Sequence, residues 1–322
     1  MNRFISAASL ALLCLAAPLN AGAQAPQGTW TKVGETTTVR TDTGIATLNG
    51  KIYLMGGQAN GVTASAMAQE FDPATQRWRD LAPLPRGGSH VGVGAMNGKI
   101  YVAGGFLANV HKDPIDQLAE YDIATNSWRS LRPMPRALGA VGLAAIGGKI
   151  HVIGGRGTDA KTVNLHQVFD LAAGKWSTAA PLPLARDHLG VTVLDGKIYV
   201  AGGRTDQTVD NTNQTDVYDP ATDKWQTVAA MPTKRSSSGI TVYKGQILSF
   251  GGECKNPQTR ATFDNIEGYD PKTNRWTEYT HHPTGLHAGG LAAVGDTAYF
   301  FSGNAGCGGD NPSNAVWAFK LP

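Results

Sequence analysis

A pattern of about 50 residues recurs along almost the whole chain and constrains the fold more than any other feature. Each copy contains a glycine pair that ends a short apolar run, as in NGKIYVAGG at residues 97–105. The first glycines of these pairs are Gly56, Gly104, Gly154, Gly202 and Gly251, with Ser302-Gly303 as a degenerate sixth pair. The intervals are 48, 50, 48, 49 and 51 residues. So regular a period predicts a repeat architecture in which each copy forms one structural unit.

Further marks keep the same period. A glycine lies twelve residues before each pair, and an aromatic residue followed by Asp comes after the pair in five copies. Seven residues beyond each of these aromatic residues is a tryptophan: Trp78, Trp128, Trp176, Trp225 and Trp276. In the second copy, residues 89–96, 99–103, 118–122 and 128–131 read as four short antiparallel strands joined by turns. One such sheet cannot bury both faces alone, so we expect the units to stack around an axis.

The glycine pair, the aromatic residue and the tryptophan together resemble the kelch repeat, over essentially all of residues 24–322. The resemblance implies an all-β fold, and six glycine pairs predict a six-bladed kelch β-propeller with four-stranded antiparallel blades. The last copy stops after a third strand at residues 315–319, whereas residues 29–32 form a strand that precedes the first copy. We therefore expect the N-terminal strand to join the last blade and close the ring, which leaves no open sheet edge.

The first 23 residues have the pattern of a secretory signal peptide. A short basic start is followed by an apolar stretch and by small residues up to Ala23. We expect residues 24–322 to form a single domain that is exported to the bacterial periplasm or secreted, as a monomer without a membrane span. The formal net charge of +3, with scattered basic residues, argues against a nucleic-acid partner.

Two cysteines remain once the signal peptide is removed. Cys254 and Cys307 each lie shortly after a glycine pair, in neighbouring repeats and on the same rim of the expected propeller. An exported protein meets an oxidising compartment. We therefore predict a disulfide that fastens blade 5 to blade 6.

Functional residues are expected on the rim that carries the long, variable connections between strands. The ligand-binding candidates there are Arg40, Arg86, His90, Arg136, Arg186, His188, Arg204, Arg235, Glu253 and His287. The arginines could bind carboxylates or sugar hydroxyls, or they could brace adjacent blades. His90 and His188 both lie two residues before an axial glycine, and each could be a catalytic base, a metal ligand or a packing residue.

The sequence predicts no metal site and no cofactor. His281-His282 lacks a third ligand at a recognisable spacing. Residues 206–216 are rich in oxygen ligands but lack the spacing and the glycine of a calcium loop. No phosphate-binding glycine loop or hydrolase Gly-x-Ser-x-Gly motif is present.

Two functions remain open. The first is a binding module for a glycan or a protein on the loop-rich rim. The polar loops, with Phe106-Leu107 as the sole apolar tip, argue against a large hydrophobic protein interface. The second is a periplasmic sugar mutarotase or epimerase similar to N-acetylneuraminate epimerase, also a six-bladed kelch propeller. For this chemistry, which is a fold-level analogy, the rim offers Arg186, His188, Arg235 and Glu253.

The propeller of galactose oxidase is also similar in its repeats. That family's copper site uses a Tyr-His dipeptide, a further histidine and a tyrosine crosslinked to cysteine. This sequence contains no Tyr-His dipeptide, and both of its remaining cysteines are assigned to the disulfide. Copper-radical oxidation is therefore not expected.

Overall fold

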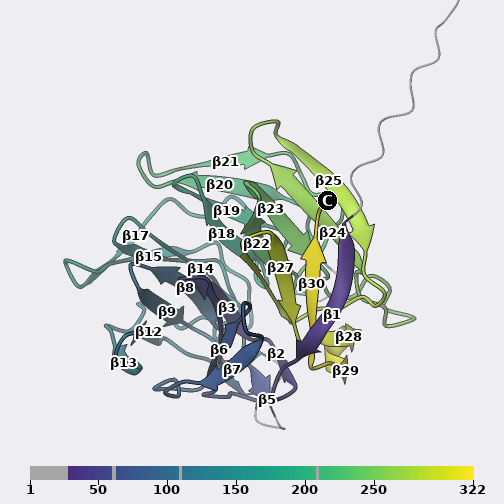
Figure 1. The fold of residues 1–322 in the computed structure, drawn as a ribbon. Helices are drawn as coiled ribbons and strands as arrows, with labels where there is room; N and C mark the ends of the chain where they lie inside the picture. The colour runs from purple at the N-terminus through teal and green to yellow at the C-terminus, as the bar shows by residue number, and fades with distance from the viewer. Residues whose placement is uncertain (1–27, 60–62, 109–110, 208–209) are drawn as a thin grey trace, which may run out of the picture.

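The computed structural model describes residues 28–59, 63–108, 111–207 and 210–322. Six four-stranded antiparallel sheets surround a central axis and form a six-bladed β-propeller (Figure 1). The predicted all-β fold, its blade number and its blade composition are confirmed. Among the described residues, no helix is long and apolar enough to cross a membrane.

The strands of each blade follow one another outward from the axis. Blade 1 contains β3 (Gly44–Leu48), β4 (Lys51–Met55), β6 (Ala68–Asp72) and β7 (Arg77–Asp80). Blade 2 contains β8 (Gly92–Met96), β9 (Lys99–Ala103), β12 (Leu118–Asp122) and β13 (Ser127–Ser130). Blade 3 contains β14 (Gly142–Ile146), β15 (Lys149–Ile153), β16 (His166–Asp170) and β17 (Lys175–Thr178).

The other three blades repeat this order, except that the last one recruits β1. Blade 4 contains β18 (Gly190–Leu194), β19 (Lys197–Ala201), β20 (Thr215–Asp219) and β21 (Lys224–Val228). Blade 5 contains β22 (Gly239–Tyr243), β23 (Gln246–Phe250), β24 (Asn265–Asp270) and β25 (Arg275–His281). Blade 6 contains β26 (Gly290–Val294), β27 (Thr297–Phe301), β30 (Ala315–Lys320) and β1 (Thr29–Glu35).

The connection between the second and third strands forms a small ribbon in blades 2 and 6: β10 (Phe106–Ala108) with β11 (Lys112–Pro114), and β28 (Asn304–Gly306) with β29 (Asp310–Pro312). In blade 1, β5 (Gln58–Ala59) of this connection pairs with β2 (Arg40–Thr41), which precedes the innermost strand. The last ribbon includes the 3-10 turn η1 (Cys307–Gly309). All of them lie on the rim where each blade's innermost strand begins, because antiparallel strands place these connections at the same end.

The repeated glycines allow the blades to approach one another closely. A Cβ added at Gly44 would overlap the Val93 side chain of the next blade. Gly104, the first glycine of its pair, has a φ of +64° and lies against the Leu138 carbonyl of the following blade. Both positions therefore favour glycine, the first for space and the second also for its left-handed backbone.

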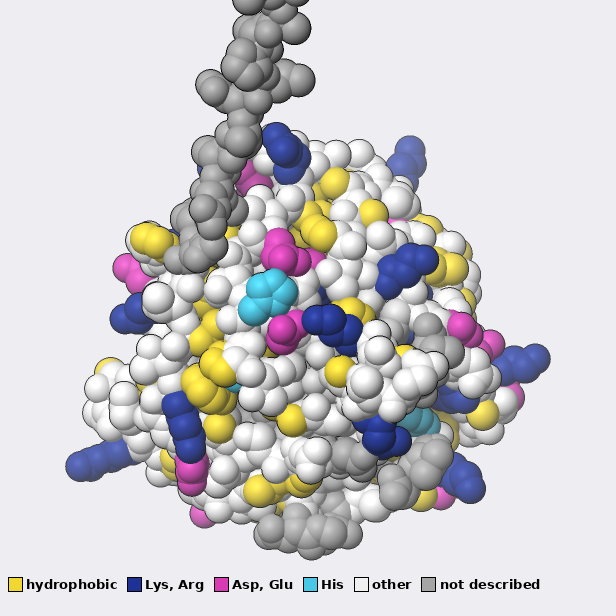
Figure 2. Space-filling view, turned by 90° about the vertical axis from the view of Figure 1, so that its right-hand side faces the viewer, with side chains coloured by type: hydrophobic (Ala, Val, Ile, Leu, Met, Phe, Trp, Pro, Cys, Tyr) yellow, Lys and Arg dark blue, Asp and Glu magenta, His cyan; other side chains and the backbone are white. Residues whose placement is uncertain are grey.

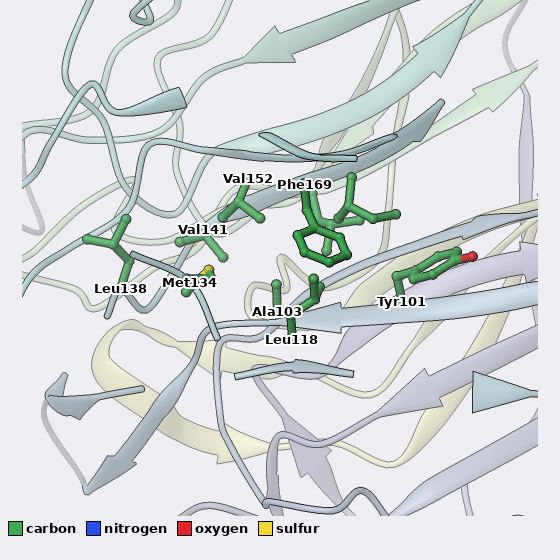
Figure 3. Close-up of a cluster of buried hydrophobic side chains, with 10 residues drawn as sticks. Tyr101, Ala103, Leu118, Met134, Leu138, Val141, Val152 and Phe169 are labelled. Carbon is green, nitrogen blue, oxygen red and sulfur yellow. The ribbon is translucent and has the colours of Figure 1, made fainter. Parts of the chain in front are cut away.

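The core is divided among the six blade interfaces. Six clusters of buried hydrophobic side chains lie between successive blades, and the sixth joins blade 6 to blade 1. Figure 3 shows the cluster between blades 2 and 3, where Tyr101 and Leu118 lie across from Val152 and Phe169. Each fully buried side chain of this size contributes about 1.5–3 kcal/mol.

The tryptophan that marks each repeat also ties its blade to the preceding one. The Trp128 indole packs on Tyr121 with ring centroids 5.0 Å apart, and its Nε1 donates to the Ala82 carbonyl of blade 1 at 2.7 Å. The corresponding tryptophans of blades 1, 3, 4 and 5 make the same kind of hydrogen bond. The fixed spacing thus reflects a contact between blades.

The first strand closes the ring, as predicted. Strand β1 pairs antiparallel with β30 (Figure 1). Trp30 lies opposite Phe319 in the register. Their ring centroids are 5.1 Å apart, so Trp30 takes the place of the tryptophan that blade 6 lacks. The predicted signal peptide lies outside the described residues.

Candidate functional site

Six backbone positions form a closed ring at the mouth of the central channel. This mouth ring consists of Asp42, His90, Ala140, His188, Ser237 and Ala288, each two residues before an innermost strand. All six have φ between 50° and 56°. Each N–H donates to the carbonyl of the ring residue in the preceding blade, over 2.7–3.2 Å, and Asp42 donates to Ala288 to complete the cycle. The repeat therefore holds six side chains at equivalent places around the axis.

Two further positions in each blade lie beside the mouth ring. One precedes the ring residue and the other follows the glycine pair, and their backbones are bonded to each other, as Asp187 is to Arg204. The residues preceding the ring are Thr41, Ser89, Gly139, Asp187, Ser236 and His287, and those following the glycine pairs are Gln58, Phe106, Arg156, Arg204, Glu253 and Asn304. The backbone is repeated while the side chains differ, so these positions determine the chemistry of the mouth.

The mouth holds a small depression above the channel. The cavity has a volume of about 110 Å³, and its lining includes Asp42, His90, His188 and Ser237 above the apolar Val91. A larger cavity of about 420 Å³ occupies the channel itself. Its lining comes from the innermost strands and contains no ionisable side chain, whereas the lining of the depression includes Asp42, His90 and His188.

An Asp–His pair joins blades 1 and 2 at the mouth. Asp42 Oδ1 lies 3.0 Å from His90 Nε2, and both side chains are about nine-tenths buried. Burial alone would raise the pKa of Asp42, but its attraction to His90, His287 and His111 outweighs burial and lowers this pKa to about 2. Asp42 is therefore a carboxylate at neutral pH and offers acceptor oxygens beside the depression.

A second Asp–His pair, in blade 4, belongs to a buried network. His188 Nδ1 lies 2.5 Å from Asp187 Oδ1, which also accepts from Arg204 Nε at 3.2 Å. Arg204 Nη2 lies 3.1 Å from His188 Nε2, and Arg204 Nη1 donates to Glu253 Oε2 at 2.6 Å. All four residues are less than a tenth exposed. The network brings together His188, Arg204 and Glu253, three of the predicted candidates.

Burial controls protonation within this network. It raises the pKa of Asp187, against the attraction of Arg204 and Arg156. It also lowers the pKa of His188 well below its usual value, and the nearby Arg204 acts in the same direction. His188 is therefore neutral at neutral pH, and it donates from Nδ1 to Asp187 while Nε2 accepts from Arg204.

The structure adds His111, which is not among the candidates predicted from the sequence. His111 lies between β10 and β11, in the connection of the same blade that carries His90. Its ring centroid is 4.9 Å from that of His90 and 4.8 Å from that of His188. The signal in the sequence was a histidine on a long connection of the blade whose mouth-ring residue is also a histidine, His90. That His111 extends across the mouth to His188 depends on how the β10–β11 ribbon folds, which the sequence pattern does not show.

Three predicted arginines lie inside the protein. Arg40, Arg186 and Arg235 are fully buried. Arg186 Nη1 donates to the carbonyls of Gly202 and Gln214, and Arg186 also pairs with Asp216, all within blade 4. Arg235 makes the equivalent bonds in blade 5. Arg40 Nη1 donates to Gln69 Oε1 of blade 1 at 3.1 Å. Each arginine thus braces its own blade, and not two adjacent blades as expected from the sequence.

The remaining candidates lie around the mouth or farther out. Arg86 and Arg136 have half-exposed side chains near Asp116 and Asp159. His287 is buried, and its Nε2 donates to the Gly306 carbonyl at 2.9 Å. Phe106 is fully buried, with its ring 5.6 Å from that of His90. The prediction that Phe106 forms an exposed apolar tip is wrong, because this residue follows the glycine pair and packs under the mouth.

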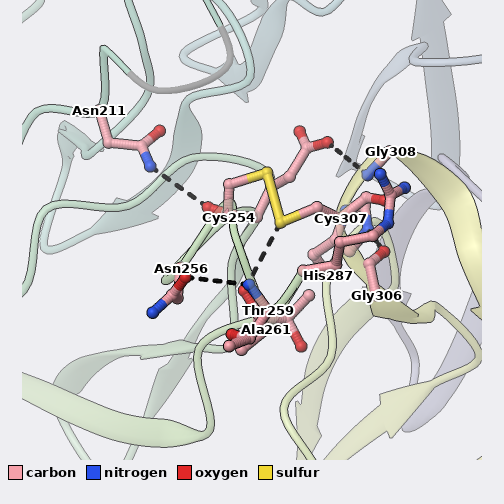
Figure 4. Close-up of a disulfide and its surroundings, with 12 residues drawn as sticks. Asn211, Cys254, Asn256, Thr259, Ala261, His287, Gly306, Cys307 and Gly308 are labelled. Atoms are coloured by element: carbon pink, nitrogen blue, oxygen red, sulfur yellow. Dashed lines mark hydrogen bonds between the residues drawn. A yellow bond between two sulfur atoms is a disulfide. The ribbon is translucent and has the colours of Figure 1, made fainter.

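The disulfide lies next to the charged network. Cys254 and Cys307 are joined with their Cα atoms 5.1 Å apart, linking the loops of blades 5 and 6 (Figure 4). Glu253 precedes Cys254, and its Oε1 accepts from the N–H of Gly308, which follows Cys307, at 3.0 Å. The crosslink therefore holds together the two segments that fix Glu253 opposite Arg204.

Comparisons with known proteins agree with this architecture. A model of the KLHDC2/KLHL20/DRC7 Kelch-repeats domain matches residues 129–303, and a Kelch motif model matches residues 40–85 and 87–135. No curated protein matches the sequence. A solved structure entitled "Structure of YjhT" superposes with a TM-score of 0.74 at 17% sequence identity, covering 88% of this chain and 96% of that one. At this identity the likeness concerns the fold alone.

Proposed function

Since the chain belongs to the kelch-repeat family, whose propellers serve as binding or enzymatic modules, we propose that it is an exported module that binds a carbohydrate at the channel mouth. The observation that carries this proposal is the small depression lined by buried and partly buried donors and acceptors. Sugars present many hydroxyl groups, which both donate and accept hydrogen bonds, and they match such a lining.

The size of the depression favours a small group. A cavity of about 110 Å³ is well below the roughly 300–1,000 Å³ of pockets that enclose drug-sized ligands. It would take one sugar unit, or the end of a longer glycan, while the remainder contacts the loops above. The residues that precede the lining residues His188, Ser237 and Ala288 carry buried polar atoms without a hydrogen-bond partner within the described structure. These atoms are Ser236 Oγ, His287 Nδ1 and Asp187 Oδ2, the last of which lies 3.6 Å from Arg156 Nη1. Buried atoms of this kind normally bond to water or a ligand.

The surface gives less support to a protein partner. Val39 is the exposed large hydrophobic residue among those described, with 38% of its surface accessible. On the face in Figure 2, hydrophobic side chains form small separate patches among uncharged and charged groups. Protein interfaces usually have an apolar centre, which this pattern does not provide.

A glycan array probed with the mature protein tests the proposal. We expect binding to a restricted set of sugars, and a loss of at least about tenfold in affinity for Asp42→Asn and Glu253→Gln, which alter the mouth. Asp159→Asn is the matched control, because Asp159 is an exposed carboxylate on a loop of the same rim. Equal binding by all three variants, or capture of a protein in place of any glycan, would contradict the proposal.

The Asp187–His188 pair supports a second candidate, a sugar mutarotase or epimerase. A neutral histidine fixed by a carboxylate can accept a proton once Arg204 releases its Nε2, and the Asp42 carboxylate lines the same depression. The rate at which sugar anomers interconvert through the open-chain form, followed by NMR, would detect this activity. Acceleration that is lost in His188→Gln but retained in His281→Gln would favour the enzyme. Glycan binding without acceleration would favour the binding module.

A further inference from the structure

Three histidines from two blades converge over the channel. His90 and His188 belong to the mouth ring, and His111 comes from the loop between β10 and β11. The three ring centroids are 4.8–4.9 Å apart, and the three ring planes meet at 77–81°. Each histidine can offer a nitrogen that lies within 4.8 Å of the other two. The rings therefore surround one point almost symmetrically, which is the arrangement of a three-histidine metal site.

We propose that His90, His111 and His188 bind a divalent first-row transition metal ion, with Zn²⁺ as the reference case. Imidazole nitrogen is a preferred ligand of zinc, copper and nickel. Tetrahedral zinc holds nitrogen at 2.0–2.1 Å, which places two ligand nitrogens about 3.3 Å apart. The observed spacing of up to 4.8 Å requires the rings to move inward by about 1.5 Å at most.

Two of the three histidines already carry carboxylate partners. Asp187 Oδ1 lies 2.5 Å from His188 Nδ1, and Asp42 Oδ1 lies 3.0 Å from His90 Nε2. Metal-binding histidines usually donate their second N–H to a carboxylate or carbonyl, which fixes the tautomer and strengthens the ligand. The two aspartates would also offset the positive charge of the ion.

Two groups compete with a metal ion for the nitrogen lone pairs of the cluster. Ser89 Oγ lies 3.1 Å from His90 Nδ1, the nitrogen that Asp42 leaves free, and Arg204 Nη2 lies 3.1 Å from His188 Nε2. The Ser89 hydroxyl can rotate away from His90. Arg204 keeps its bonds to Asp187 and Glu253 when a metal ion takes the lone pair of His188.

Three protein nitrogens leave one position of a tetrahedral ion open. His90 and His188 line the depression, so the open position can take water or an oxygen of a bound molecule. This inference is independent of the carbohydrate proposal. Metal binding is measured without sugar, and glycan binding can be repeated with a chelator, so either proposal can fail while the other stands.

Titration of the metal-free mature protein with Zn²⁺ and Co²⁺ tests the inference. We expect one ion per chain by calorimetry, and a visible Co²⁺ absorption of the intensity typical of four-coordinate sites. His111→Ala should weaken Zn²⁺ binding at least about 100-fold without unfolding the protein, because His111 lies on a loop outside the mouth ring's backbone bonds. Asp187→Asn should weaken it about 10–100-fold through His188.

His281→Ala is the matched control, since His281 is a half-exposed histidine beside Asp264 and Glu278 on the outer strand of blade 5. Its Zn²⁺ affinity should equal that of the unmodified protein. Absence of stoichiometric binding would overturn the proposal and leave the three histidines as a packing cluster. Equal affinity in His111→Ala would overturn it as well, because the bound ion would then lie elsewhere. Thermal unfolding of each variant identifies any loss that comes from misfolding.

Discussion

Trp30 packs against Phe319 with ring centroids 5.1 Å apart, so the two ends of the described chain meet in one blade. The ring centroid of Trp30 also lies 4.6 Å from that of Phe250 in blade 5. We expect Trp30→Ala to lower the free energy of unfolding by roughly 3 kcal/mol, because a large ring is lost at the point of closure. Urea denaturation measures the change. Val39→Ala, at an exposed site, should change it by less than about 0.5 kcal/mol, and a similar small effect for Trp30→Ala would argue against closure through β1.

The buried arginines should matter for stability more than the exposed ones. Arg186→Met leaves Asp216 buried without its cationic partner, and we expect a loss of about 3–5 kcal/mol by chemical denaturation. Arg136→Met, at a half-exposed side chain, should cost less than about 1 kcal/mol. If Arg186→Met unfolds at the same urea concentration as the unmodified protein, the bracing role assigned to Arg186 is wrong.

Mass spectrometry of the purified protein tests the disulfide. The intact mass should rise by two hydrogens on reduction, and detection of two free thiols before reduction would contradict the pairing. The cysteines are 53 residues apart in the chain, for which loop-closure entropy gives a stabilisation of about 4 kcal/mol. The double variant Cys254→Ser and Cys307→Ser should lose a substantial part of this stabilisation. Its Glu253 should also be held less firmly between Arg204 and Gly308.

A buried histidine pair should make stability depend on pH. His151 Nδ1 lies 2.9 Å from His166 Nε2 in blade 3, and burial lowers their pKa values to about 3 and about 4. An unfolded histidine has a pKa of about 6.5, so the unfolded chain binds more protons below that pH. Their stabilising contribution is complete above pH 6.5 and is lost as the pH falls toward 4.

His166→Leu removes one of these titrating groups. Leucine occupies the equivalent position of blade 2 at Leu118, which makes the substitution compatible with the repeat. Between pH 6.5 and pH 5 the free energy of unfolding should fall in both proteins, and the fall should be smaller in the variant by on the order of 2 kcal/mol. Denaturation series at both pH values provide the comparison. Parallel losses in the two proteins would show that other groups dominate the acid response.

The repeat allowed the fold to be predicted because its marks are contacts between blades. The spacing from Tyr121 to Trp128 repeats since every blade uses the same ring pair and the same indole hydrogen bond. The site was predicted less completely. Arg186 and Arg235 occupy the position that is Leu138 and Leu286 in other blades, so aligning the copies already indicates a core position. The bracing role considered for these arginines holds, but within one blade and not between adjacent blades.

His111 could not be placed from the sequence for a different reason. The connections after the glycine pairs vary in length and composition, so their residues cannot be aligned from one repeat to the next. Its position depends on how the β10–β11 ribbon folds over Phe106, which is 5.4 Å from the His111 ring. Long-range placement of this kind depends on packing that local patterns do not encode.

The cyclic chain of hydrogen bonds at the mouth has a practical consequence for redesign. Every bond in it uses main-chain atoms, so the side chains at those six places can be exchanged while the circle of amides stays intact. Ala140 and Ala288 each contribute only a methyl group, so these two positions carry no functional side chain. A larger or polar residue introduced at either position would place a new side chain at the mouth while the backbone of the propeller is kept.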